Sequence, residues 1–98
     1  MFAKLERLRW MFGASRGYGA GQFDHPYGVA IGGEGHIVVA DTFNSRLQVL
    51  RPDGTHVRTI GSRGEGAGQF SYPSGVVFDG EGSIVVADCA YGRLQVLR

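Results

Sequence analysis

The sequence predicts an all-β fold made of two similar antiparallel units of four short strands, joined by tight turns. Three observations support this prediction. Residues 16–50 align with residues 63–97 at a shift of 47 positions without a gap, and 23 of the 35 aligned residues are identical. The 98-residue chain contains 17 glycines, well above the roughly 7% of an average protein. Short runs rich in valine, isoleucine and leucine separate the glycine-rich segments, which is typical of strands between turns.

The first unit contains four runs with the composition of strands. These runs are residues 27–32, 36–40, 46–50 and 55–61. The second run is β-branched and continuously apolar, as in a strand that is covered on both faces. The connections are rich in turn-forming residues, and the Pro-Asp-Gly sequence before the fourth run is a strong hairpin signal. Four antiparallel strands in one repeat of this length describe one blade of a β-propeller.

A glycine-rich phrase, Arg-Gly-x-Gly-Ala-Gly-Gln-Phe, opens both units, at 16–23 and at 63–70. A nucleotide-binding loop has no reason to recur in register with every other element of a repeat. No helix is predicted after the phrase to present its N-terminus to a phosphate. We therefore interpret the glycines as turn residues that permit positive φ angles.

Two blades leave apolar faces uncovered, because each blade of a repeat fold packs on its neighbours. We expect residues 1–12 to form an N-terminal segment with an outer strand, residues 13–61 to form the first repeat with its outer strand, and residues 62–98 to form the second repeat without one. The run at 8–13 would then complete a last blade. Two explanations stay open: further blades of a longer chain, or a homo-oligomer in which three chains close a ring.

Composition and charge exclude several classes of protein. The formal net charge of +1 is too small to indicate nucleic acid or a membrane surface by itself. The single cysteine, Cys89, cannot form an internal disulfide and fits a reducing compartment. No apolar run approaches the roughly 18 residues of a membrane span, and the charged start of the chain does not read as a secretory signal. We expect a cytoplasmic protein that does not bind membranes.

Alternating strand direction places the connections at 13–26, 41–45, 61–73 and 88–92 on one end of both units. These connections are rich in arginine and aromatic residues, which anchor protein partners and single-stranded nucleic acid. The predicted partner-binding residues are Arg16, Tyr18, His25, Tyr27, Phe43, Arg63, Tyr72 and Tyr91. Two acidic and basic pairs that recur at the same positions are predicted to hold turns, namely Asp41 with Arg46 and Asp88 with Arg93.

The combined motifs resemble the NHL repeat. The pattern runs from Gly-x-Gly-Gln-Phe through Pro-x-Gly-Val and Val-Ala-Asp to Asn-x-Arg-Leu-Gln-Val, and the first unit has it in full between Gly19 and Val49. The second unit departs from it at Tyr91 and Gly92, where we expect a differently shaped turn. The resemblance covers residues 13–98 and implies blades of a propeller, commonly six-bladed, that serves as a binding platform.

The resemblance implies a non-catalytic module for protein recognition, such as the substrate-recruiting part of a ubiquitin ligase. Single-stranded RNA binding by the same face is the first alternative. A metal-dependent lyase or hydrolase of propeller type is the second, although the innermost strands offer only Asp79. The three histidines lie in different elements without a second ligand at metal spacing. We therefore expect no enzyme, no metal and no cofactor.

Overall fold

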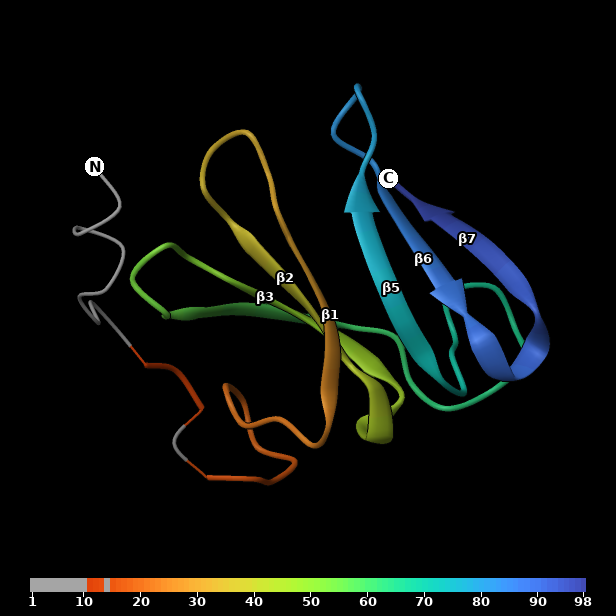
Figure 1. The fold of residues 1–98 in the computed structure, drawn as a ribbon, viewed down its shortest axis with the longest axis horizontal. Coiled ribbons are helices and arrows are strands. Elements are labelled where there is room, and N and C mark those ends of the chain that lie inside the picture. Colours follow the sequence, from red (N-terminus) through yellow and green to blue (C-terminus); the bar gives the residue numbers. More distant parts are fainter. Residues whose placement is uncertain (1–10, 14) are drawn as a thin grey trace, which may run out of the picture.

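A computed structural model describes residues 11–13 and 15–98, and it consists of two antiparallel sheets side by side (Figure 1). The sheets follow one another along the chain, and within each sheet every strand pairs with the next. The first sheet contains β1 (Pro26–Ile31), β2 (Ile37–Asp41), β3 (Arg46–Leu50) and β4 (His56–Ile60). The second contains β5 (Pro73–Phe78), β6 (Ile84–Asp88) and β7 (Arg93–Leu97). The predicted all-β fold is confirmed.

The two sheets share the same register, as expected from the repeat. Pro26 pairs with Asp41 in the first sheet, and Pro73 pairs with Asp88 in the second. Both proline residues begin a strand, where a missing N–H group is tolerated, and a bulge follows each of them. Short 3-10 helices, η2 (Thr42–Asn44) and η3 (Cys89–Tyr91), connect the second strand of each sheet to the third.

The strand predicted at 8–13 falls mostly outside the described residues. Residues 11–13 belong to no strand, and residues 8–10 are not described. Within the described chain the second sheet has three strands, so its completion by the N-terminal segment stays a prediction. No helix in the described part of the chain is long and apolar enough to span a membrane.

Alternate residues of a strand point to opposite sides, so each sheet has two faces. Both faces of these sheets are apolar. We call one side the front face; in the first sheet it is formed by Val38, Ala40, Leu47 and Val49. The opposite side is the back face; in the first sheet it is formed by Val29, Ile31, Ile37, Val39 and Leu50. The faces of the second sheet consist of the residues 47 positions later.

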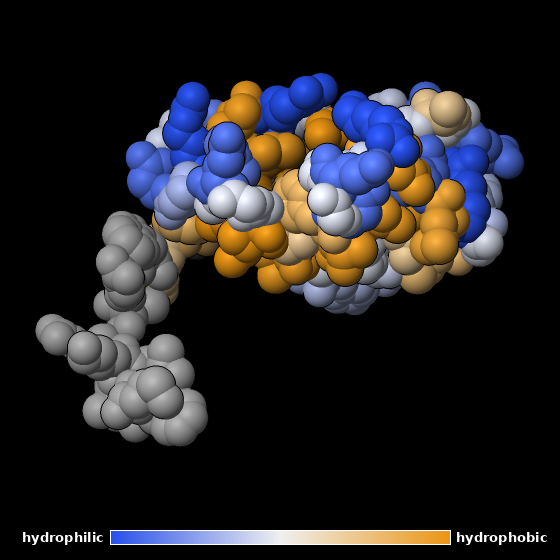
Figure 2. Space-filling view, turned by 90° about the horizontal axis from the view of Figure 1, so that it is seen from above, coloured by the Kyte–Doolittle hydropathy of each residue, from blue (hydrophilic) through white to orange (hydrophobic). Residues whose placement is uncertain are grey.

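The hydrophobic core lies where the front face of the first sheet meets the back face of the second. The front-face residues of the first sheet belong to one buried cluster with Phe70, Val76 and Val86. Strand β5 lies along β1 and β2, which brings these two faces together (Figure 1). The two outward faces keep exposed apolar side chains, and hydrophobic residues reach the surface beside hydrophilic ones (Figure 2).

Candidate functional site

The loops that enter β1 and β5, together with η2 and η3, form one end of the molecule, which we call the loop face. Its segments are residues 13–26, 41–45, 61–73 and 88–92. The backbone N–H of Phe43 donates to the carbonyl oxygen of Asp24 over 3.1 Å, and that of Cys89 donates to Tyr72 over 3.0 Å. The loops predicted to share an end therefore contact one another directly.

The glycine-rich phrase folds around a glutamine side chain. Gln22 Oε1 accepts a hydrogen bond from the Gly19 N–H over 3.0 Å, and Gln48 Oε1 on β3 accepts one from the Gly21 N–H over 2.9 Å. A β-carbon on Gly17 would lie 2.4 Å from Gln22 Oε1, so the glycine leaves room for this side chain to approach. The second repeat makes the same two bonds with its equivalent residues. These N–H groups are used inside the protein, which argues against a phosphate cradle.

Beneath this phrase lies a buried polar network centred on Asp41, which is fully buried. Its carboxylate accepts hydrogen bonds from the Asp24 N–H (2.7 Å), from Arg46 Nε (2.8 Å), from Asn44 Nδ2 (3.0 Å) and from Gln48 Nε2 (3.2 Å). A buried carboxylate is stable only with such partners. Asp41 and Arg46 thus tie the entry loop, η2 and β3 together. The sequence interpretation missed Gln48, although a glutamine that recurs in an otherwise apolar strand was a signal of this role.

The equivalent network in the second repeat is looser. Asp88 is fully buried, but its oxygen lies 3.5 Å from Arg93 Nη2, which also donates to the Gln69 carbonyl oxygen over 2.9 Å. The Nε of Arg93 is buried and has no hydrogen-bond partner among the described residues. Tyr91 stands where Asn44 stands in the first repeat, so the amide that donates to the carboxylate is absent.

The sequence predicted a differently shaped turn at Tyr91 and Gly92, and this prediction was wrong. Gly92 adopts a left-handed conformation with φ of 60°, and its equivalent Ser45 adopts the same conformation with φ of 55°. Both residues donate a backbone hydrogen bond to the first residue of the preceding 3-10 helix. The difference between the repeats lies in the side-chain hydrogen bonds and not in the backbone.

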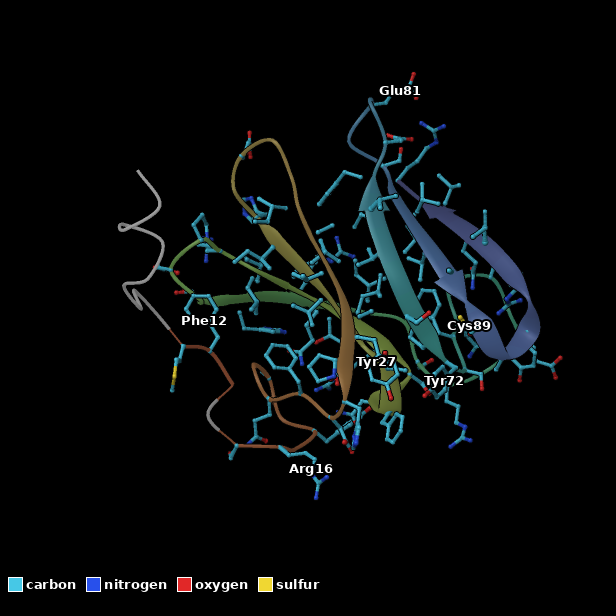
Figure 3. The ribbon with its side chains drawn as sticks, viewed as in Figure 1. Phe12, Arg16, Tyr27, Tyr72, Glu81 and Cys89 are labelled. Atoms are coloured by element: carbon cyan, nitrogen blue, oxygen red, sulfur yellow. The ribbon has the colours of Figure 1, made fainter. Side chains whose placement is uncertain are left out.

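Four of the predicted partner-binding residues form one aromatic patch across the boundary between the sheets: His25, Tyr27, Phe43 and Tyr72. The rings of His25 and Phe43 are stacked at 4.0 Å, and Tyr72 lies 5.8 Å from Phe43 and 6.0 Å from Tyr27. Tyr27 and Tyr72 lie side by side near the start of β1 and β5 (Figure 3). Tyr27 is 57% exposed and Phe43 is 49% exposed, so much of the patch faces solvent.

Polar groups orient two rings of the aromatic patch. His25 has a positive φ of 52°, and its Nδ1 lies 2.6 Å from the carboxylate of Asp24. A hydrogen bond that the Tyr72 hydroxyl donates to Tyr27 raises the pKa of Tyr72 above its ordinary value, because this bond favours the neutral phenol. The patch therefore offers flat apolar surface with hydroxyl and imidazole groups at its edge.

The other predicted partner-binding residues lie outside the aromatic patch. Tyr18 lies under the guanidinium of Arg46 at 4.3 Å, and Tyr91 lies under that of Arg93 at 5.1 Å. Each tyrosine thus covers a structural arginine of its own repeat. Two exposed arginines make no side-chain hydrogen bond or ion pair with any residue that the structure describes: Arg16 and Arg63.

A propeller enzyme would need an acidic residue on an inner strand, and Asp79 is the candidate there. Its observed role is structural. Asp79 lies in the hairpin turn at the opposite end from the loop face, where its Oδ1 accepts hydrogen bonds from the Glu81 N–H (2.8 Å) and the Ser83 N–H (2.9 Å). These bonds hold its pKa below the ordinary value. Within residues 11–13 and 15–98, no three histidine, cysteine or acidic side chains gather as a metal site.

Comparison with known proteins identifies related sequences in several animals. The chain is 59% identical over 34 residues to B-box type zinc finger protein ncl-1 of Caenorhabditis elegans. It is 51% identical over 41 residues to E3 ubiquitin-protein ligase TRIM71 of Rattus norvegicus, and 40% identical over 42 residues to protein wech of Drosophila melanogaster. These matches cover 35–43% of this chain but only 4–5% of each relative.

The NHL repeat family matches residues 23–50 and 70–97, which together make up more than half of the chain. Both matched segments run from the phenylalanine of the glycine-rich phrase to the end of the third strand of a sheet. The chain belongs to the NHL repeat family, and its two sheets are neighbouring blades of a β-propeller.

Proposed function

We propose that the chain is a non-catalytic recognition module that binds a protein partner through the aromatic patch of the loop face. The observation that supports this proposal is the patch itself, because both blades contribute rings to it and Tyr27 and Phe43 remain largely exposed. Exposed aromatic residues held in fixed orientations are the side chains that most often dominate protein interfaces.

The relatives indicate the setting in which such a module would act. TRIM71 carries the name of an E3 ubiquitin-protein ligase. The present 98 residues include one cysteine and three histidines, too few for the zinc-binding domains of such a ligase. The proposed role is therefore recruitment of a substrate protein, with the ligase chemistry supplied by other domains or partners.

Comparative capture tests this function. The native chain, the double variant Tyr27→Ala with Phe43→Ala, and the control Val57→Ala would each be immobilised and exposed to the same cell extract. Val57 is an exposed apolar residue of β4, outside the loop face. A partner of the patch is captured by the native chain and the control, and its capture falls by about tenfold or more in the double variant. Equal capture by all three proteins would contradict the proposal.

Single-stranded RNA is the second candidate ligand, because Arg16 and Arg63 are exposed cations on the same end as the aromatic patch. Binding to a polyuridine strand would then weaken steeply as the salt concentration rises. The variant Arg16→Ala with Arg63→Ala would reduce that salt dependence and leave the protein partner bound. Absence of measurable affinity for the strand at low salt would exclude this candidate.

A further inference from the structure

The two outward faces of the molecule share most of their residues with the two faces that pack together inside it. The front face of the first blade and the exposed front face of the second agree at all four positions: Val38 and Val85, Ala40 and Ala87, Leu47 and Leu94, Val49 and Val96. The front of the second blade is open, since Leu94 is 71% exposed whereas Leu47 is fully buried.

The back faces show the same agreement. Val29, Ile37, Val39 and Leu50 on the back of the first blade correspond to Val76, Ile84, Val86 and Leu97 on the back of the second, without a change of residue, and the fifth position changes from Ile31 to Phe78. The β1 part of this back face is also open, since Val29 is 63% exposed and Ile31 is 68% exposed, whereas Val39 and Leu50 are buried. One chain therefore presents both halves of an interface that it has already formed once internally.

From this repetition we infer that the exposed front face of the second blade binds the exposed back face of the first blade in a second copy of this chain. The contact repeats the internal interface between blades, so its occupant has the shape and composition that the face already accepts. It joins different patches on the two copies, so copies add head to tail and either close into a ring or extend. This inference concerns assembly and goes beyond the recognition function proposed for the loop face.

A hollow on the back of the first blade fits this occupant. It has a volume of about 460 Å³ and is lined by Phe23, Val29, Ile31, Val39 and Leu50, among others. The equivalents of Phe23, Val29 and Val39 in the second blade pack in one cluster with Leu47 of the first blade. Leu94 of a second copy is the equivalent of Leu47, so its side chain would enter this hollow.

The surfaces differ from the internal ones in several ways, and the first is a loss of hydrogen bonds. Inside the chain, Thr42 Oγ1 and Ser45 Oγ donate hydrogen bonds to the carbonyl oxygens of Pro73 and Ser71. The equivalents of these two donors in the second blade are Cys89 and Gly92, so the contact between copies lacks both hydroxyl groups. We therefore expect an interface that is weaker than the internal one and depends on protein concentration.

The second difference concerns side-chain volume. Gly32 of the first blade packs closely against the ring of Phe78, where an added β-carbon would lie 3.0 Å from the ring. The equivalent pair between copies is Asp79 against Ile31. Asp79 is larger than Gly32, and Ile31 is smaller than Phe78. This exchange keeps the two surfaces compatible in volume.

Gly75 provides the sharpest test. A β-carbon on its equivalent, Gly28, would lie 1.9 Å from the carbonyl oxygen of Ser74 across the internal interface. A β-carbon on Gly75 itself meets only the β-carbon of Ala87 at 3.7 Å, which is an ordinary contact. Gly75→Ala should therefore leave the single chain intact and clash with the backbone of an incoming copy at Tyr27.

Sedimentation velocity across a range of concentrations would measure assembly of the native chain, of Gly75→Ala, and of the control Gly80→Ala, which has open space at its β-carbon. We expect the native chain and the control to form species of two or more copies as concentration rises. Gly75→Ala should raise the dissociation constant by at least about tenfold. A native chain that stays monomeric throughout, or equal assembly of all three proteins, would overturn the inference.

Mixing two variants tests the head-to-tail arrangement. Leu94→Glu removes the front site and Ile31→Glu removes the back site, both at exposed positions. Each variant alone should be monomeric with a native circular dichroism spectrum. Their mixture should form only one-to-one dimers, because one intact front and one intact back remain. Larger complexes in the mixture, or dimers of either variant alone, would contradict a head-to-tail contact.

Discussion

Replacement of Leu47 and of Leu94 by alanine compares one residue type at equivalent positions of the two blades. Leu47→Ala removes a side chain from the core between blades, and Leu94→Ala removes one from an open face. Truncation of a buried leucine costs about 2–5 kcal/mol, since the transfer free energy and the cavity both count. Leu94 is 71% exposed, and full burial of a leucine is worth about 1.5–3 kcal/mol. Leu94→Ala should therefore cost less than about 1 kcal/mol.

Urea denaturation followed by circular dichroism would measure both costs, at a protein concentration low enough for the chain to be monomeric. The free energy of unfolding of Leu47→Ala should fall by at least twice as much as that of Leu94→Ala, with similar urea dependence in both. Equal losses in the two variants would refute the packing of the first blade's front face against the second blade.

Three further predictions concern the polar network, the blade interface and pH. Asp41→Ala leaves the buried guanidinium of Arg46 without its carboxylate and should lower the free energy of unfolding by about 3–5 kcal/mol in urea denaturation; an unchanged midpoint would show that the network does not stabilise the fold. Gly28→Ala places a β-carbon 1.9 Å from the Ser74 carbonyl oxygen, so its thermal midpoint should fall, whereas a midpoint equal to that of the native protein would mean that the blades lie further apart. The pKa of Asp79 is lowered from 3.8 by its backbone hydrogen bonds, so its contribution to stability is present above that value and is lost as pH falls through the lower folded pKa. The difference in urea midpoint between the native chain and Asp79→Asn should therefore shrink on going from pH 7 to pH 3. A difference that grows would contradict the stabilising role of the Asp79 carboxylate.

The strands were predictable because the repeat presents each of them twice. The β-branched run before Asp41 and the identical run before Asp88 are bounded by the same turn residues, so their assignment did not depend on a single segment. The predicted second strand, 36–40, differs from the observed one, Ile37–Asp41, by one residue at each end. Alternating strand direction also indicated which loops share an end.

The aromatic patch was only partly predictable. The sequence identified His25, Tyr27, Phe43 and Tyr72 as surface residues, but their stacking depends on how the two blades approach each other, which no local pattern encodes. Tyr18 and Tyr91 were grouped with them, although each lies over an arginine of its own repeat. Such pairing is decided by side-chain directions in loops, where sequence spacing gives little information.

The shape of the turn after β6 was mispredicted for a related reason. The departure from the repeat pattern at Tyr91 and Gly92 indicated a different backbone. Left-handed φ angles are uncommon for residues other than glycine. Ser45 nevertheless adopts that conformation, and its hydroxyl donates a hydrogen bond to Ser71 in the second blade. A tertiary contact that the sequence does not reveal accompanies this conformation.

Nuclear Overhauser effects in a methyl-labelled sample would test the arrangement of the blades most directly. At low protein concentration, the methyl groups of Val38 and Leu47 should show effects to the Phe70 ring or to the methyl groups of Val76 and Val86, while those of Leu94 should show none to these groups. Effects from Leu94 to the Phe70 ring, or none from Leu47 to the second blade, would contradict the packing of front face on back face.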